Sequence, residues 1–407
     1  MKGWTQKRIG DLFDVKAGGD LQEANYSPCP TAEAQWPIYA NSLENKGLYG
    51  YTSKPRFSGN AVTITGRGDI GHAEFRPDDF DAIVRLLVLL PKAEVDCRYI
   101  TYYINSHVHF PKESTGVPQL TAPKVKRIKI DLPQSKEEQA AIANILSKVD
   151  EAITSVQNSI AAAERLKKSL MQNLLTGKMK PDGTIRTSEE FYIDEKFGIV
   201  PVGWEVKRIK DFGEVQTGKT PPTDEPAVFS EKENGFMFIT PGDLDVAKYI
   251  EHTERYVSEK GLRYSYVLPK GTVCEVCIGS TIGKIGITTV ECCSNQQITS
   301  VIVNNKHDAE YLYYAMLSRR EHFKSVAGIN ATPQINKSGY SKYRVLCPKD
   351  KLEQIAIAKS ISSVDKRIIE QEQKIKSLER LKKSLMQNLL TGKVICSHSL
   401  NINSIFI

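Results

Sequence analysis

The chain carries one fifteen-residue segment, ERLKKSLMQNLLTGK, twice, at 164–178 and at 379–393, an offset of 215 residues. Upstream matches keep this offset, and the N-terminal ends of the two copies match at an offset of 200, where Gly3-Trp4 corresponds to Gly203-Trp204. A period this long excludes a solenoid of short repeats. The chain is therefore one unit made twice, with similar ends and dissimilar middles.

Similar ends indicate that the same packing or the same partner is needed twice. Dissimilar middles indicate two different ligands of one class. Drift in two weakly constrained globular domains is the alternative explanation.

The C-terminal part of each copy predicts a long helix, because apolar residues recur at alternating spacings of four and three, as in a coiled-coil seam. We expect the first seam to continue through Leu166, Leu170 and Leu174 after a local phase slip. Gly177 and Gly392 are the expected C-terminal caps. Each helix needs an apolar partner, either the other helix or its own globular domain. The seam residues are Ile142, Leu146, Val149, Ile153, Val156, Ile160 and Ala163 in the first copy, and Ile357, Ile361, Val364, Ile368, Gln371, Ile375 and Leu378 in the second.

The globular segments, residues 4–130 and 204–346, are rich in short apolar runs, glycine and proline, which predicts α+β domains of mainly antiparallel strands. Residues 179–200 are polar and predict a connector. The expected elements are β-hairpins at 60–75 and 271–288 and short helices at 99–104 and 311–317.

Composition narrows the class of protein. The formal net charge of +7 suits a nucleic-acid partner, although an unrelated basic protein has a similar charge. No apolar run approaches the roughly 18 residues of a membrane span, and the first residues lack the apolar core of a signal peptide. The eight cysteines form no short secreted disulfide framework. We therefore expect a cytoplasmic protein with no membrane partner.

Several segments are informative together: VGWEVKRIKDFGEVQTGKT (202–220), SNQQI (294–298), PQIN (333–336), LPQSKEEQAAIANIL (132–146), CPKDKLEQIAIAKSI (347–361) and the two LLTGK helix ends. In their order and duplication, these segments resemble the specificity subunits of Type I restriction–modification systems, over nearly the whole chain. The first copy departs from the pattern, since no proline precedes Gly3 and nothing resembles SNQQ. The tail 394–407 matches nothing recognisable.

The resemblance implies an α+β fold with two similar, mainly-β target recognition domains, separated by two long helices packed as an antiparallel coiled coil. The implied divisions are target recognition domain 1 (1–131), a central helical spacer (132–178), a connector (179–200), target recognition domain 2 (201–347), a C-terminal helical spacer (348–393) and a tail (394–407).

The resemblance also implies a function. Each domain reads one half of a bipartite site in double-stranded DNA, two methyltransferase (M) subunits dock on the helices, and restriction/translocation (R) subunits join the complex. The chain itself is then a non-catalytic subunit of an adenine methyltransferase and restriction complex, with no metal or cofactor of its own. S-adenosylmethionine, ATP and Mg are expected on the partner subunits.

Candidate DNA contacts are basic and amide side chains on glycine-flanked hairpin loops, because phosphates attract Lys and Arg and base edges favour Arg, Lys, Asn and Gln. Gln119 and Gln334 lie in a PQ element common to both copies, and we expect them to position the fold rather than to read sequence. The candidates are Lys54, Arg56, Arg67 and His72 in the first copy, and Lys219, Ser280, Lys284, Gln296, Gln297 and Asn336 in the second.

The identical helix ends are candidate docking sites for a partner protein, with a solvated helix face as the alternative. The candidate residues are Arg165, Lys168 and Leu174 in the first copy and Arg380, Lys383 and Leu389 in the second.

Three other interpretations remain open. GEVQTGKT at 213–220 fits the phosphate-binding P-loop formula of a nucleotide hydrolase, but Pro221-Pro222 follows it and disfavours the helix that this loop requires. The second is a coiled-coil adaptor that does not touch DNA. The third is a zinc site at Cys274, Cys277, Cys292 and Cys293, although the first copy has Val62 and Thr65 at the first two positions.

Overall fold

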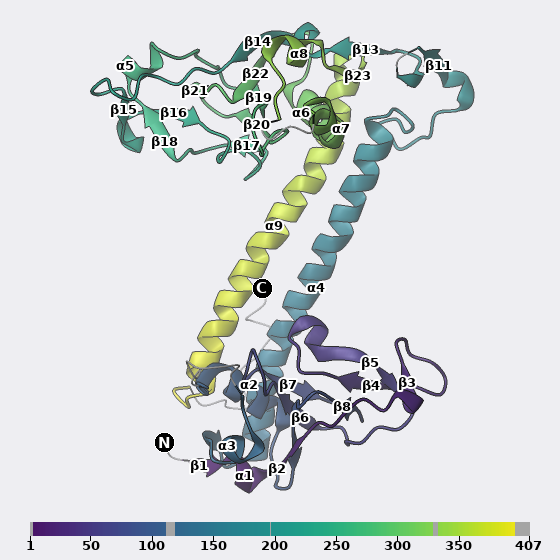
Figure 1. Ribbon diagram of the computed structural model, residues 1–407, viewed down its shortest axis with the longest axis vertical. Coiled ribbons are helices and arrows are strands. Elements are labelled where there is room, and N and C mark those ends of the chain that lie inside the picture. The colour runs from purple at the N-terminus through teal and green to yellow at the C-terminus, as the bar shows by residue number, and fades with distance from the viewer. Residues whose placement is uncertain (1–2, 111–118, 196, 329–332, 395–407) are drawn as a thin grey trace. The chain divides into compact units, whose positions relative to one another are not determined.

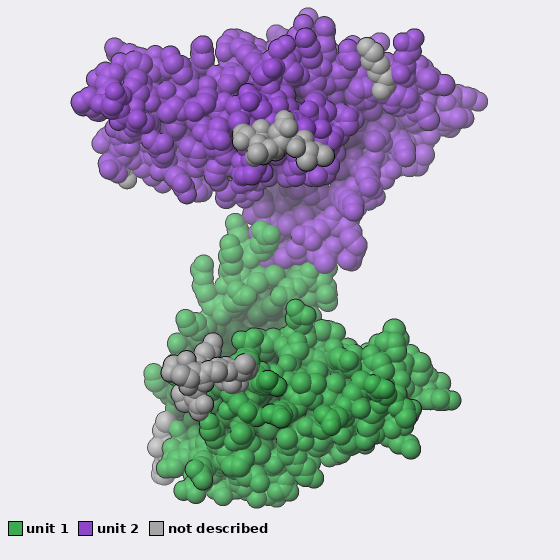
Figure 2. All heavy atoms as spheres, in the orientation of Figure 1, with its two compact units in different colours: residues 1–158, 372–407 green, residues 159–371 purple. Residues whose placement is uncertain are grey.

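A computed structural model describes residues 3–110, 119–195, 197–328 and 333–394. The chain forms two compact units, shown in two colours in Figure 2: unit 1 comprises 1–158 and 372–407, and unit 2 comprises 159–371. Each unit thus contains one globular domain and part of both long helices. No helix of the described residues is long and apolar enough to cross a membrane.

The globular part of unit 1 is built on two four-stranded sheets with orders β2-β9-β6-β7 and β3-β5-β4-β8, and a separate antiparallel pair β1-β10. Only the β4–β8 pairing among these described strands is parallel. The strands are β1 (Trp4–Arg8), β2 (Phe13–Ala17), β3 (Tyr26–Ser27), β4 (Trp36–Tyr39), β5 (Leu48–Thr52), β6 (Ala61–Ile64), β7 (Ala73–Arg76), β8 (Asp81–Ala82), β9 (Leu87–Pro91) and β10 (Lys129–Pro133).

Helix α2 (Cys97–His107) covers the β6–β7 side of the first sheet, and its N-terminus is capped by the Asp96 carboxylate, which accepts the N–H groups of Arg98 and Tyr99. The shorter helices of this domain are α1 (Ile9–Leu12), α3 (Ala122–Lys126) and the 3-10 helices η1 (Glu23–Asn25) and η2 (Glu44–Gly47).

Unit 2 repeats this plan with a five-stranded sheet, β14-β22-β19-β20-β17, a four-stranded sheet, β15-β18-β16-β21, and the pairs β13-β23 and β11-β12. Its strands are β11 (Phe191–Asp194), β12 (Gly198–Pro201), β13 (Trp204–Arg208), β14 (Gly213–Thr217), β15 (Phe229–Ser230), β16 (Phe236–Ile239), β17 (Tyr249–Ile250), β18 (Arg255–Val257), β19 (Val273–Val276), β20 (Ile285–Thr288), β21 (Cys292–Ser294), β22 (Ile298–Val303) and β23 (Arg344–Pro348). Its shorter helices are η3 (Ser188–Glu190), η4 (Ile209–Asp211), η5 (Lys232–Asn234), α5 (Glu259–Leu262), α6 (Ala309–Ser318), α7 (Arg320–Val326) and α8 (Lys337–Lys342).

The duplication seen in the sequence is a duplication of structure. Trp4 pairs with Pro133 in β1–β10, and Trp204 pairs with Pro348 in β13–β23. The predicted hairpins are confirmed as β6–β7 and β19–β20, and the predicted short helices as α2 and α6. The polar connector contains more structure than we expected, namely the hairpin β11–β12.

The long helices are α4 (Lys136–Leu174) and α9 (Lys351–Leu389), each of 39 residues (Figure 1). Gly177 and Gly392 follow their ends with φ of +68° and +65°, which confirms both predicted caps. In unit 1 the start of α4 shares a core with Leu389 and Leu390 at the end of α9. In unit 2 the start of α9 shares a core with Leu174 at the end of α4. The two helices therefore pack against each other in opposite directions, and each also packs on a globular domain.

The predicted phase slip in the α4 seam is wrong. Leu166 is 49% exposed, whereas Ala163 is buried and the half-buried Lys167 takes the next seam position. The alternation of four and three then continues through Leu170 and Leu174 without a break. An apolar pattern misses this position because the residue there is a lysine, whose charge is neutralised by Asp365.

Candidate nucleic-acid interface

The turn between β6 and β7 presents Arg67 in unit 1. Gly68 and Gly71 have φ of +75° and +91°, so the turn requires glycine at both positions. The Asn41 side chain fixes the backbone, since its Oδ1 accepts the N–H of Arg67 at 3.2 Å and its Nδ2 donates to the Arg67 carbonyl at 2.6 Å. The Arg67 side chain itself is exposed. A rigid backbone thus holds out one long basic side chain.

The PQ element anchors this turn in both copies. In unit 1, Gln119 forms a β-bridge with Arg67. In unit 2, Gln334 forms the corresponding bridge with Ile278, and the next residue, Ile335, donates its N–H to the Cys277 carbonyl at 2.9 Å. The contact uses backbone atoms in both copies, which agrees with the expected positioning role of this element.

His72 follows the same turn but lies beside an acid. Its Nε2 is 3.0 Å from Glu74 Oε1. Burial acts to raise the pKa of Glu74, but the hydrogen bond from His72 and the charges of Lys46 and Arg76 outweigh it, so this pKa is lowered. The carboxylate therefore stays ionised and reduces the attraction of His72 for a phosphate.

The two other candidate DNA contacts in unit 1, Lys54 and Arg56, differ in whether the fold already binds their side chains. Lys54 is exposed. Arg56 is held by the fold, since its Nε donates to Asp81 Oδ1 at 2.6 Å and its Nη2 to the carbonyls of Asp20 and Ala82 at 3.1 Å. Arg56 thus has a structural role in the loop that carries it.

In unit 2, four of the predicted residues come together around the β19–β20 turn. The backbone N–H of Lys219 donates to Ser294 at 2.9 Å, and the exposed Gln296 accepts a hydrogen bond from the Thr220 hydroxyl. The Gln297 carbonyl accepts the N–H of Cys277, at the start of the turn that presents Ser280. These contacts place the segments that carry Lys219, Gln296, Gln297 and Ser280 next to one another.

The remaining two candidates of unit 2 are engaged in the fold. The half-buried Lys284 lies 3.4 Å from the carbonyl of Pro241. Asn336 caps α8, and its Oδ1 accepts the N–H of Gly339 at 2.8 Å.

Sequence reasoning missed two basic residues near these turns. Arg85 is exposed with φ of +59°, and its carbonyl is 2.9 Å from where a Cβ on Gly66 would lie. It lies among apolar residues, and no glycine marks its turn in the sequence. Lys337 is exposed, with its Nζ 3.4 Å from Gln216 Oε1. It lies at the start of α8, and nothing in the sequence indicates which way this residue faces.

The P-loop interpretation of residues 213–220 is wrong. Residues 213–217 form β14, which pairs along its length with β22. No helix of the described chain starts at Lys219, and the next helical turn is η5. The segment lacks the loop of converging N–H groups that holds a phosphate.

The four cysteines of the predicted zinc site do not form one cluster, because Cys277 lies in a different hydrophobic core from Cys274 and Cys292. Burial raises the pKa of the Cys274 thiol to about 12. Within the described ranges, no group of three or more His, Cys, Asp or Glu residues is arranged to hold a metal ion.

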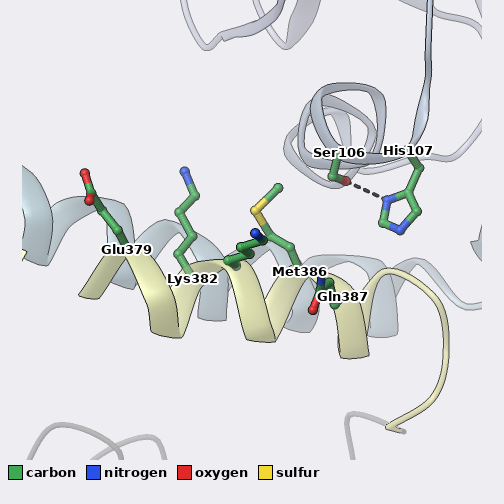
Figure 3. Close-up of a pocket in the computed structure, with 7 residues that line it drawn as sticks. Ser106, His107, Glu379, Lys382, Met386 and Gln387 are labelled. Atoms are coloured by element: carbon green, nitrogen blue, oxygen red, sulfur yellow. Dashed lines mark hydrogen bonds between the residues drawn. The ribbon is translucent and has the colours of Figure 1, made fainter. Parts of the chain in front are cut away.

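Of the candidate docking residues on the identical helix ends, the basic ones are exposed and the two leucines are buried. Arg165, Lys168, Arg380 and Lys383 are exposed, whereas Leu174 and Leu389 are 1% and 2% exposed and belong to the cores. These two leucines therefore stabilise this chain and are not presented to a partner. Next to the second helix end, a hollow of about 500 Å³ lies between the end of α2 and α9 (Figure 3). Its lining residues are Ser106, His107, Glu379, Lys382, Lys383, Met386 and Gln387.

Comparison with known proteins assigns the family. The family described as Type I restriction modification DNA specificity domain matches residues 1–165 and 201–380. The HindI specificity subunit of Haemophilus influenzae is 23% identical, over 97% of this chain and 100% of its own length. The MjaVIII specificity subunit of Methanocaldococcus jannaschii is 26% identical, over 74% of this chain and 71% of its own length. The fold is similar to the crystal structure of a Type I restriction–modification S subunit from M. genitalium, with a TM-score of 0.64, 17% identity and coverage of 95% and 96% of the two chains.

A duplicated α+β domain joined to two long helices is the architecture that this chain shares with the family. The chain belongs to the Type I restriction–modification DNA specificity family. Its function is that of a specificity subunit.

Proposed function

We propose that each globular domain of this specificity subunit reads one half of a bipartite site in double-stranded DNA. The observation that carries the proposal is that two separately built turns, β6–β7 with Arg67 and β19–β20 with Ser280, are anchored by the same PQ element. The anchor is common to both copies while the presented side chains differ, as expected for two readers of different sequences on one scaffold.

The exposed basic residues of the two identical helix ends suit two equivalent partners, and we assign these partners as two methyltransferase (M) subunits. R subunits then join this complex. A structure that describes complex assembly of the type I R-M system is similar in fold to this chain, with a TM-score of 0.52 and 14% identity. We assign the binding of S-adenosylmethionine, ATP and Mg, and the transfer of methyl groups to adenine, to these partners in the cytoplasm.

Methylome sequencing tests the proposal. The chain is expressed with the M subunit of its own system in a host that lacks other adenine methyltransferases, and the control strain expresses the M subunit alone. We expect methylated adenines only in the strain with both proteins, in a motif of two short sequences with a non-specific gap. Methylation of one uninterrupted motif, or equal methylation in the control strain, would contradict the proposal. The purified chain alone is expected to transfer no methyl group and to hydrolyse no ATP.

A further inference from the structure

A Tyr–Asp–Lys cluster joins the long helices to each globular domain. In unit 1 the Asp150 carboxylate lies 2.6 Å from Lys382 Nζ and accepts the Tyr102 hydroxyl at 2.7 Å. The Lys382 Nζ also lies 5.6 Å from the centre of the Tyr102 ring. Asp150 is on α4, Lys382 on α9 and Tyr102 on α2, so one carboxylate connects three elements. Figure 3 shows Lys382 extending from α9 in this region.

Unit 2 contains the same cluster with the roles of the two long helices exchanged. Asp365 on α9 lies 2.5 Å from Lys167 Nζ on α4, and it accepts the hydroxyl of Tyr314 on α6. A shift of 215 positions converts Asp150 into Asp365 and Lys167 into Lys382. Burial and the hydrogen bond to the acid raise the pKa of both tyrosines, so both hydroxyls remain protonated donors at neutral pH.

Both lysines occupy positions of the apolar seam. Their side chains are only 27% and 29% exposed, for Lys167 and Lys382 respectively. A charge in a coiled-coil seam costs stability unless an opposite charge lies at the right height on the partner helix. The seam therefore favours alignments that place an acid beside each lysine.

The duplicated pattern selects one alignment. In a parallel pair with equivalent residues side by side, Asp150 would face Asp365 and Lys167 would face Lys382. The antiparallel pair converts both like-charge contacts into attractions. A slip of one heptad, about 10 Å at 1.5 Å per residue, would move Lys382 from Asp150 to Ala143 or Gln157, neither of which is charged.

We propose that Lys167 and Lys382 are specificity-determining residues: with Asp365 and Asp150 they fix the direction and register of the α4–α9 pair, and so the length of the gap between the two DNA half-sites. The claim about the gap between half-sites rests on the proposed function, whereas the claim about the alignment of the helices does not. The lysines act by positioning the domains and touch no base.

A charge-exchange series in unit 1 tests the alignment. The variants are Asp150→Lys, Lys382→Asp and both together, and the matched control exchanges the exposed pair Lys366 and Glu370 of α9. We expect each single variant to lose at least tenfold in methylation at the native gap, and the double variant to recover to within about threefold of the native protein. The control exchange should change methylation less than twofold. Failure of the double variant to recover while the folded control is normal would overturn the proposal.

A second variant separates register from stability. Lys167→Met and Lys382→Met are combined with Asp150→Asn and Asp365→Asn. These changes remove both charges of each pair and keep an oxygen that accepts each tyrosine hydroxyl, so urea unfolding should show the same or a higher midpoint. Motif sequencing should then detect methylation at sites with altered gaps, in at least a tenth of reads at such sites. A strictly native gap in this folded variant would overturn the proposal. If the native protein directs methylation to no bipartite motif, the proposed function is refuted. The alignment can still be tested in that case, because the double charge-exchange variant should recover the unfolding midpoint that the single variants lose.

Discussion

Gln139 Oε1 accepts the backbone N–H of Asp96 at 3.0 Å, and Gln354 makes the same contact with Asp308 at 3.0 Å. The amide nitrogens of both glutamines donate to proline carbonyls, of Pro133 and Pro348. Both glutamines are buried, at 2% and 0% exposure. Gln139 thus connects the first turn of α4 to the N-cap residue of α2, and Gln354 connects the first turn of α9 to the N-cap residue of α6.

Replacing Gln139 with alanine should therefore leave two buried backbone groups without partners. We expect a loss of about 2 kcal/mol in the free energy of unfolding, measured with urea. The exposed Gln134 gives the control, and Gln134→Ala should stay within about 0.5 kcal/mol of the native protein. Equal unfolding curves for the two variants would show that the buried amide does not stabilise this joint.

Arg67→Ala should weaken recognition of one half-site only. A lost bidentate contact to a base costs about 1–3 kcal/mol, roughly 10- to 100-fold in binding. Lys92→Ala is the matched control, since Lys92 is exposed at the opposite end of β9 from Arg67. Competition binding of the assembled complex with DNA altered in either half measures the effect. Equal relaxation of both halves would contradict separate reading by the two domains.

Lys219→Ala should reduce the salt dependence of DNA binding. Each phosphate that the protein neutralises contributes about 0.9 to the slope of log affinity against log salt concentration. The slope for this variant should fall by about one, with little change in sequence preference. Titrations of the complex between about 50 and 200 mM salt measure the slope. An unchanged slope would place Lys219 away from the phosphates.

Glu275 predicts a pH dependence of unit 2. Burial raises the pKa of this carboxyl from 4.5 to about 8, although the charge of Arg320 acts to lower it. Between these values the folded state keeps a proton that the unfolded state loses, so the free energy of unfolding should fall as the pH rises from 4.5 to 8 and level off above. Glu275→Gln should flatten this fall and stabilise unit 2 by about 2 kcal/mol at pH 8, measured by thermal unfolding at several pH values. Glu251→Gln, at an exposed position, should keep the native profile.

A paired insertion should lengthen the recognised gap. Seven residues added after Asn158 in α4 and seven added after Gln373, the equivalent position in α9, preserve the seam. They lengthen each helix by about 10 Å, near three base-pair steps of about 3.4 Å. Motif sequencing should then find unchanged half-sequences with a longer gap. An insertion in α4 alone is the control, and because it displaces one seam against the other it should abolish methylation.

Helices and hairpins of this fold were predictable where the sequence carries a regular apolar pattern or glycines at turns. The apolar seam predicted both long helices, and glycines at required turns predicted the two hairpins. Lys167 was hidden because a pattern of apolar residues cannot include a lysine whose partner acid is 198 positions away. Arg85 was hidden because its left-handed turn contains no glycine. Arg56 and Asn336 look like free polar residues in the sequence, and only the structure shows that their side chains already bind Asp81 and the start of α8.

The division of each long helix between two units also affects how the chain matures on the ribosome. The N-terminal segment of unit 1 is made before unit 2, but the core of unit 1 includes Leu389 and Leu390. Residues 159–371 separate its two segments, which takes about 10–40 s of synthesis at roughly 5–20 residues per second. Through that interval the apolar face at the start of α4 lacks its final cover. Of the two units, the one whose synthesis starts earlier is therefore completed later, and a message cut short within α9 yields a protein whose defect lies in the core of unit 1.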